Sequence, residues 1–183
     1  MEIESDIPKI PDFQLSEKQF LLQHTDLEEK DRQHIIEEIF QAIKKDHLAP
    51  YYHYLHTEIS DFPYDESLYR ELASENEKVI EELKLKIKEA EDEEDTELDV
   101  ASTTTKLAEY YTKIIDRKNA TETFKKVLEL TPNTGSKIDH LLTLTRIDFF
   151  FNDLPLVQKH LEQIGQLSEK GGDWERRNRF KAY

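Results

Sequence analysis

Apolar side chains recur every three or four residues along most of this chain, and that spacing predicts helices. The clearest stripe belongs to a segment that we expect to be one helix ending at about Asp46. Its members are Ile35, Ile36, Ile39, Phe40 and Ile43. A stripe of this kind is stable only when a second helix covers it. The pattern therefore predicts an all-α protein in which helices pack on one another.

Residues 1–14 contain two prolines and show no helical period, so we expect an extended arm there. Two capping-box patterns follow, Ser16 with Gln19 and Thr25 with Glu28, and each predicts the start of a helix. The first of these helices is expected to bury Phe20, Leu21 and Leu22.

Two further helices are predicted before residue 96. Pro50 suits the first turn of one, because the N–H that proline lacks would be unpaired there, and Tyr51, Tyr54 and Leu55 share a face of it. Asp65 can cap the second, a long helix to about Ala90. Its apolar seam consists of Leu68, Leu72, Val79, Ile80, Leu83 and Ile87. The near-heptad spacing is compatible with a coiled-coil partner, although packing on neighbouring helices of the same chain is the commoner outcome.

An acidic segment separates the two halves of the chain. Eight of the eleven residues between Glu89 and Asp99 are acidic, and none of them suits a core. A calcium loop needs a glycine at its turn, and this segment has none. We therefore expect residues 15–96 to form N-terminal helices that end in a solvated linker.

The residues from 97 onward follow a repeat template. Its positions are Leu107, Ala108, Tyr111, Ala120, Phe124 and Pro132, at the offsets of a tetratricopeptide repeat. The two alanines would allow a close approach of two antiparallel helices, with residues 116–119 as the turn between them. A second helix pair is expected over residues 138–151 and 154–167, and Asp173 can cap a further helix. Residues 97–183 are thus predicted to be a tetratricopeptide-like solenoid, a right-handed superhelix of antiparallel helix pairs preceded by additional helices.

Charge narrows the classes of partner. The net charge of −15 disfavours binding of nucleic acid across the whole surface. Only Arg176, Arg177 and Arg179, with Lys181, form a basic cluster, which we expect to meet acidic groups of this chain or of a neighbouring subunit. No apolar run is long enough to span a membrane. The N-terminus is acidic and has no apolar run, so we expect neither a secretory signal nor a mitochondrial presequence. The chain lacks cysteine, which fits a reducing compartment.

No catalytic or cofactor-binding motif is recognisable. His53 and His56 lie three residues apart and His47 precedes them, but the sequence has no His-Glu-x-x-His motif and no cysteine to complete a metal site. The sequence has no phosphate-binding loop, no dinucleotide fingerprint and no nucleophile elbow. We therefore predict that the protein is not an enzyme and has no cofactor, metal or small-molecule ligand.

Several segments together resemble the non-ATPase subunit 6 family of the 26S proteasome regulatory particle lid. They are residues 15–22, 48–52, 135–139, 146–153 and above all 171–181, Gly-Gly-Asp-Trp-Glu-Arg-Arg-Asn-Arg-Phe-Lys. The resemblance covers nearly the whole chain and is weakest in its acidic middle. It implies a noncatalytic scaffold in the cytoplasm and nucleus, in contact with other lid subunits, the ATPase ring and the core particle. It also implies a C-terminal PCI domain, before which this chain would be truncated.

The residues expected at partner interfaces are the tyrosines of the Pro50 helix, the terminal arginines and the long helix from Asp65 to Ala90. The individual side chains are Tyr51, Tyr52, Tyr54, Arg176, Arg177 and Arg179. Two alternatives stay open: a PCI scaffold subunit of the COP9 signalosome, and an RNA-associated helical-repeat adaptor that uses the terminal basic cluster.

Overall fold

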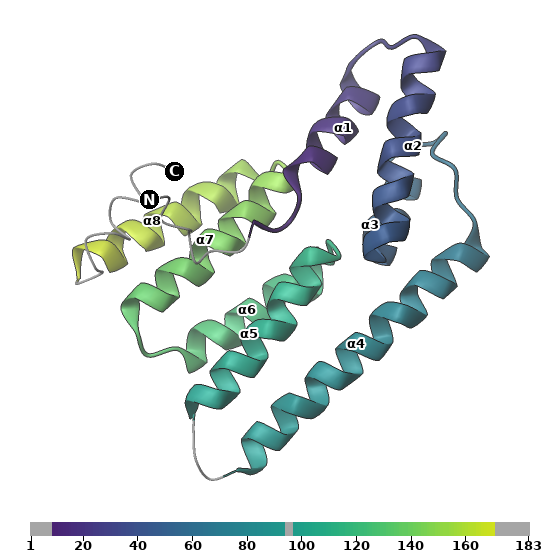
Figure 1. Ribbon diagram of the computed structural model, residues 1–183. Helices are drawn as coiled ribbons and strands as arrows, with labels where there is room; N and C mark the ends of the chain where they lie inside the picture. The colour runs from purple at the N-terminus through teal and green to yellow at the C-terminus, as the bar shows by residue number, and fades with distance from the viewer. Residues whose placement is uncertain (1–8, 94–96, 171–183) are drawn as a thin grey trace, which may run out of the picture.

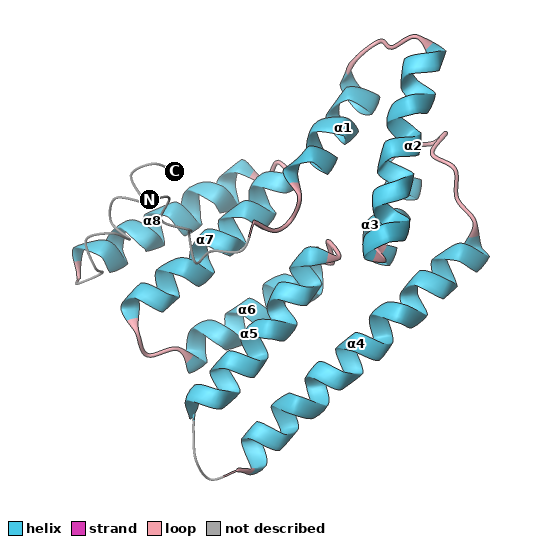
Figure 2. Cartoon of the chain, in the orientation of Figure 1, coloured by secondary structure: helices cyan, strands magenta, loops and turns pink. Residues whose placement is uncertain are grey.

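The computed structural model describes residues 9–93 and 97–170, and this part contains helices and no strand (Figures 1 and 2). The all-α prediction is confirmed. The helices are α1 (Phe13–His24), α2 (Glu29–Asp46), α3 (Ala49–Glu58), α4 (Glu66–Asp92), α5 (Glu97–Lys113), α6 (Arg117–Leu130), α7 (Thr134–Phe150) and α8 (Leu154–Glu169).

Helices α4 to α8 lie side by side in chain order, and each contacts the next (Figure 1). The α5/α6 and α7/α8 hairpins are the two predicted helix pairs. Ala108 and Ala120 have no exposed surface, and Phe124 is 1% exposed beside them. Small side chains at this point allow the two backbones to approach closely, as the repeat template requires. The helical-repeat arrangement is confirmed.

The predicted turn at residues 116–119 is wrong. Asp116 is the N-cap of α6, where its Oδ1 accepts a hydrogen bond from the N–H of Asn119 (3.2 Å), so residues 117–119 already belong to the helix. The turn is formed instead by Ile114 and Ile115, both buried. Ile115 has a φ of 63°, which is costly for a β-branched residue, and burial of its side chain offsets part of that cost.

Left-handed residues end two other helices in the same way. His47 (φ 54°) follows α2 and Asn152 (φ 56°) lies just beyond α7. In each case the next N–H donates to a carbonyl five residues back, from Leu48 to Ile43 (3.0 Å) and from Asp153 to Asp148 (2.8 Å). This motif uses carbonyls that a helix end would otherwise leave unpaired, and it lets the next helix begin within a few residues.

Neither predicted capping box starts a helix. Helix α1 begins at Phe13, capped by Asp12, and the Ser16 hydroxyl donates to the Phe13 carbonyl (2.9 Å). Thr25 ends α1, and α2 begins at Glu29 without a side-chain cap. The predicted buried face of α1 is right for Leu22, which is 5% exposed, and wrong for Phe20 and Leu21, which are 59% and 38% exposed. The residues of α1 that are buried are Leu15, Gln19 and Leu22.

The acidic segment is more helical than predicted. Helix α4 continues to Asp92 and α5 begins at Glu97, so only a few residues remain between them. Carboxylates at a helix C-terminus are unfavourable for the helix dipole. Packing outweighs this cost, because α4 runs against α5 and its Ile87 and Ala90 are half-buried. Helix α4 packs on α3 and α5 of the same chain. Of the two possibilities for its apolar seam, a coiled-coil partner or neighbouring helices of this chain, the described residues show the second.

Asn76 connects the N-terminal helices to the repeats. Its side chain is buried, and its Nδ2 donates both to the carbonyl of His47 (2.7 Å) and to the hydroxyl of Tyr110 (3.0 Å). One amide therefore joins the end of α2, the middle of α4 and helix α5.

The segment before α1 is held against helix α7. Arg146 of α7 donates from Nε to the carbonyl of Ile10 (3.0 Å) and from Nη2 to that of Pro11 (3.3 Å). Its guanidinium also lies 4.2 Å from the ring centroid of Phe13. Pro11 is buried. These contacts explain why α1 starts earlier than its sequence predicts, since packing of Phe13 stabilises the extra turn.

Glu109 on α5 gives a stability prediction. Burial raises the pKa of its carboxyl, and nearby Lys106 lowers it by less. The folded state thus disfavours the charged carboxylate, which lowers the free energy of unfolding. This loss of stability is fully present above the pKa of Glu109 in the folded state, and it is absent below the pKa in the unfolded state, about 4.3. Glu109→Gln is expected to raise the melting temperature at neutral pH and to leave it nearly unchanged at about pH 4. Thermal unfolding at both pH values measures the change in melting temperature. The control is Glu122→Gln on the exposed face of α6, and an equal rise in melting temperature from that substitution would contradict the prediction.

None of the helices in the described residues is long and apolar enough to cross a membrane.

Candidate protein-interaction surface

The tyrosines predicted to face a partner lie in the core. Tyr51 and Tyr52 have no exposed surface, and Tyr54 is half-buried. The Tyr51 hydroxyl donates to Oε1 of Gln19 (2.9 Å), and its ring meets that of Phe150 edge-on with centroids 5.6 Å apart. The expectation that Tyr51 and Tyr52 bind a partner is therefore wrong.

Contacts on two sides of α3 explain the error. The Tyr52 hydroxyl accepts a hydrogen bond from the N–H of Asp65 (2.7 Å), and its ring meets Phe40 of α2 edge-on at 5.8 Å. On the other side, Tyr54 packs edge-on against Phe151 at 5.2 Å. Helix α3 thus contacts α2, the start of α4 and the end of α7, while His53 and His56 on its remaining side stay exposed. Burial raises the pKa of Tyr51 far above its usual value, so this phenol stays neutral.

The histidines of α3 pack against aromatic rings. His56 stacks on Tyr64 with centroids 4.0 Å apart, and His53 lies 5.7 Å from the ring of Tyr69. Burial, together with the hydrogen bond from the hydroxyl to Glu66, raises the pKa of Tyr64 to about 12. Within residues 9–93 and 97–170, no group of three or more histidines or carboxylates is placed to hold a metal ion.

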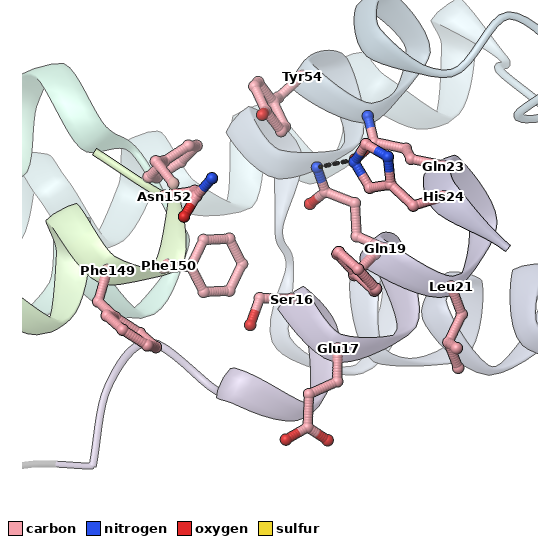
Figure 3. A pocket seen from close by; sticks show the side chains of 12 residues that line it. Ser16, Glu17, Gln19, Leu21, Gln23, His24, Tyr54, Phe149, Phe150 and Asn152 are labelled. Atoms are coloured by element: carbon pink, nitrogen blue, oxygen red, sulfur yellow. Dashed lines mark hydrogen bonds between the residues drawn. The ribbon is translucent and has the colours of Figure 1, made fainter. Parts of the chain in front are cut away.

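A groove of about 500 Å³ opens between α1 and the C-terminal end of α7 (Figure 3). We call it the α1–α7 groove. Two aromatic side chains on its sides remain largely exposed, Phe20 at 59% and Phe149 at 58%. The described residues that line it are Ser16, Glu17, Gln19, Phe20, Leu21, Gln23, His24, Tyr54, Phe149, Phe150, Phe151 and Asn152.

The walls of the α1–α7 groove are held by contacts beneath it. Gln19 accepts the Tyr51 hydrogen bond from below and donates to Gln23 (3.3 Å) along α1. The ring of Phe13 lies 5.9 Å from that of Phe149. The contact between Phe13 and Phe149 joins residues more than 130 positions apart in the sequence, so the groove exists only when α1 packs on the repeats.

A buried charge network lies behind the end of α7. Asp148, with its side chain 3% exposed, has Oδ2 2.6 Å from Nδ1 of His160 and Oδ1 3.8 Å from Nη2 of Arg117. Arg117 also pairs with Asp153 at 2.6 Å and lies over the Phe151 ring at 5.1 Å. Arg117 holds the pKa of Asp153 below its usual value. The network, named here the Asp148 network, joins α6, α7 and α8.

The family model described as 26S proteasome subunit RPN7 matches residues 65–183, which is well over half of the chain. The chain belongs to the RPN7 family. The resemblance to the non-ATPase subunit 6 family is thereby confirmed, because members of one family carry both names.

Three relatives show how far the likeness to the RPN7 family extends. The 26S proteasome regulatory subunit RPN7 of Saccharomyces cerevisiae is 38% identical over 99% of this chain and 47% of its own length. Subunit rpn7 of Schizosaccharomyces pombe is 33% identical over 95% of this chain and 44% of its own. The 26S proteasome non-ATPase regulatory subunit 6 of Caenorhabditis elegans is 30% identical over 97% of this chain and 43% of its own length. The chain thus spans a little under half the length of these RPN7-family relatives.

The remaining predicted site residues, Arg176, Arg177 and Arg179, lie outside the described residues, and their role stays a prediction. Sequence reasoning missed the α1–α7 groove. One signal was present: three consecutive phenylalanines, Phe149 to Phe151, cannot all face the core of a helix with 3.6 residues per turn. At least one of them had to be exposed, and Phe149 is that residue.

Proposed function

We propose that this chain acts as a noncatalytic scaffold in the lid of the 26S proteasome regulatory particle. The observation that carries the proposal is the RPN7 family match over residues 65–183, the region that contains the helical repeats. Through its contacts the scaffold supports lid assembly and hence ATP-dependent degradation of ubiquitinated proteins. Its proposed partners are other lid subunits, the ATPase ring and the core particle, in the cytoplasm and nucleus.

The form of the molecule supports this role. A row of antiparallel helices presents broad charged faces, and side-by-side stacking gives a long surface for protein contacts. The recognisable motifs of nucleotide binding and of nucleophilic catalysis are absent from the sequence. The strongly negative net charge supports a protein partner over a nucleic acid.

Affinity purification of the tagged full-length protein tests the scaffold role. Proteasome lid subunits are expected in stoichiometric amounts after washing at physiological salt. A tagged variant with Phe124→Ala, which disturbs the core of the first repeat, is expected to recover less of them. Stoichiometric recovery of signalosome subunits in place of lid subunits would overturn the assignment.

A further inference from the structure

A further groove, of about 340 Å³, lies over helix α5 and has α4 and α6 as its walls. Helix α5 contacts both neighbours, and the three helices lie side by side (Figure 1). We call it the α4–α6 groove. Its floor includes Thr104, Leu107 and Tyr111 of α5, all buried, and its walls carry charged side chains. The groove thus combines a closed floor with polar walls.

The floor of the α4–α6 groove holds a hydroxyl without a hydrogen-bond partner. Tyr111 is only 6% exposed and lines the groove, yet its hydroxyl bonds to no group in the described part of the chain. The oxygen is not fully enclosed, so a ligand in the groove can reach it. Burial, and to a lesser extent the charge of Asp116, raises the pKa of Tyr111, so the hydroxyl keeps its proton and can donate it to a bound acceptor.

Asn119 supplies an acceptor at the same end of the α4–α6 groove. The turn between α5 and α6 brings the start of α6, with Asn119, beside the end of α5, with Tyr111. The Asn119 Nδ2 donates to Oδ2 of Asp116 (2.8 Å). Because an ionised carboxylate only accepts, this contact fixes the amide orientation, and Oδ1 of Asn119 has no partner in the described residues. A donor and an acceptor are what the C=O and N–H groups of an extended peptide backbone require.

The walls of the α4–α6 groove carry both signs of charge at each end. Lys84 and Glu91 stand on α4, and Glu122 and Lys126 stand on α6. The short connections make α4 and α6 both antiparallel to α5, so Lys84 lies toward the end with Glu122, and Glu91 lies toward the end with Lys126. All four are exposed, and none forms an ion pair within the described part of the chain. A nucleic acid or a uniformly charged peptide would meet repulsion at each end, so charge complementarity favours an occupant with both signs.

The size of the α4–α6 groove favours an extended segment over a helix. Lys84 and Glu91 are seven residues apart on α4, which is about 10 Å along the helix axis. A helix with its side chains is about 10 Å across, so that length of helix occupies about 800 Å³. An extended strand occupies about 480 Å³ over the same length, because strands lie about 4.8 Å apart within a sheet and about 10 Å apart between sheets. A groove of about 340 Å³ can hold most of the strand and less than half of the helix.

We infer that the α4–α6 groove binds an extended segment of another protein in which a basic and an acidic side chain lie two positions apart. Glu122 and Lys126 are about 6 Å apart along the axis of α6, and side chains two positions apart share one face of a strand at about 6.6 Å. The basic side chain meets Glu122, the acidic one meets Lys126, and the backbone bonds to Tyr111 and Asn119. This inference rests on the proposed role in a protein assembly, and it names the chemistry of one partner.

Photo-crosslinking in living cells tests the inference on the full-length protein. One version carries p-benzoyl-phenylalanine in place of Leu130 on the α6 wall, and the other carries it in place of Lys125, which is exposed on α6 outside the groove. We expect the Leu130 position alone to crosslink to a protein segment with oppositely charged residues two positions apart. No crosslink, the same crosslink from both positions, a segment without that pair, or a second copy of this chain would each overturn the inference.

A charge exchange on α6 sharpens the test, with the crosslinked segment made as a fluorescent peptide. Glu122→Lys/Lys126→Glu in the full-length protein is expected to weaken binding about tenfold or more without a change in net charge. A peptide with its own two charges exchanged should bind this variant as tightly as the original peptide binds the unchanged protein. The control, Lys125→Glu/Glu129→Lys, exchanges exposed charges at the same spacing outside the groove and should leave binding unchanged. Equal affinity for both variants, or no recovery with the exchanged peptide, would refute the site.

Tyr111→Phe tests the backbone contact by removing the hydroxyl alone. Because this hydroxyl has no partner in the described part of the chain, urea unfolding should show unchanged stability, while peptide binding is expected to weaken about fivefold. Unchanged binding would exclude Tyr111 from the site and contradict the proposed backbone contact. A crosslinked segment without co-purifying lid subunits would keep the groove and remove the proteasome assignment. Lid subunits recovered without any crosslink would do the reverse.

Discussion

Phe124→Ala is expected to lower the free energy of unfolding of this chain by about 3–5 kcal/mol. The Phe124 ring on α6 is 1% exposed and lies 6.0 Å from the ring of His140 on α7, in the same core as Ala108 and Ala120, which have no exposed surface. The backbones at this point are already close, so the surrounding helices cannot collapse into the space that the ring leaves. Urea unfolding followed by circular dichroism measures the loss.

The matched control is the same substitution at an exposed ring. Phe20→Ala removes a side chain that is 59% exposed, and we expect it to change the free energy of unfolding by less than about 0.5 kcal/mol. Together the two variants separate a residue needed for folding from one that is free to bind a partner. A loss at Phe20 as large as that at Phe124 would show that Phe20 is structural, and it would remove the reason for its exposure in the α1–α7 groove.

The repeats could be predicted from the sequence because their contacts are local. Ala108 and Ala120 are twelve positions apart and belong to one hairpin, so their spacing alone fixes which helix faces meet. The same holds for Asp65, whose carboxylate accepts the N–H of Ser67 (2.9 Å) and starts α4 as predicted. Short-range rules of capping and periodicity are sufficient where the partner lies nearby in the chain.

The N-terminal helices were predicted less well because their partners are distant. Ser16 and Thr25 satisfy the sequence rule for helix caps, yet neither starts a helix. Packing of Phe13 on Arg146 of α7 stabilises an earlier start of α1, at Phe13 with Asp12 as its N-cap. A local capping preference is worth about 1 kcal/mol, and tertiary contacts of this kind exceed it.

The error at Tyr51 and Tyr52 has the same origin. Their α3 segment shows polar and aromatic residues in close alternation, which is typical of a half-exposed surface helix. Its burial depends on α2 on one side and on Phe150 and Phe151 of α7 on the other. No sequence pattern near residue 51 reports a contact with residues 150 and 151. The α1–α7 groove could not be predicted for the same reason, since each of its walls comes from a different end of the chain.

Asp148→Ala is expected to destabilise the chain by about 2–4 kcal/mol. The Asp148 carboxylate is buried and lies against His160 and Arg117, so its removal takes away the recorded partner of the His160 ring and one of the two carboxylates beside Arg117. The guanidinium keeps its pair with Asp153, which limits the cost. Hydrogen exchange should show faster opening at the end of α7 and the start of α8, where the Asp148 network joins the two helix pairs.

Asp61→Ala provides the control for Asp148→Ala. Asp61 also pairs with an arginine, Arg32, but its side chain is 52% exposed. Water screens the Asp61 pair and replaces it when the carboxylate is removed, so we expect a loss of no more than about 1 kcal/mol. The double variant Asp148→Ala/His160→Ala should lose less than the sum of its single substitutions, because the two side chains share one contact. Additive losses, or an Asp148 loss no larger than that at Asp61, would mean that the helix pairs are held by apolar packing alone and that the Asp148 network does not contribute.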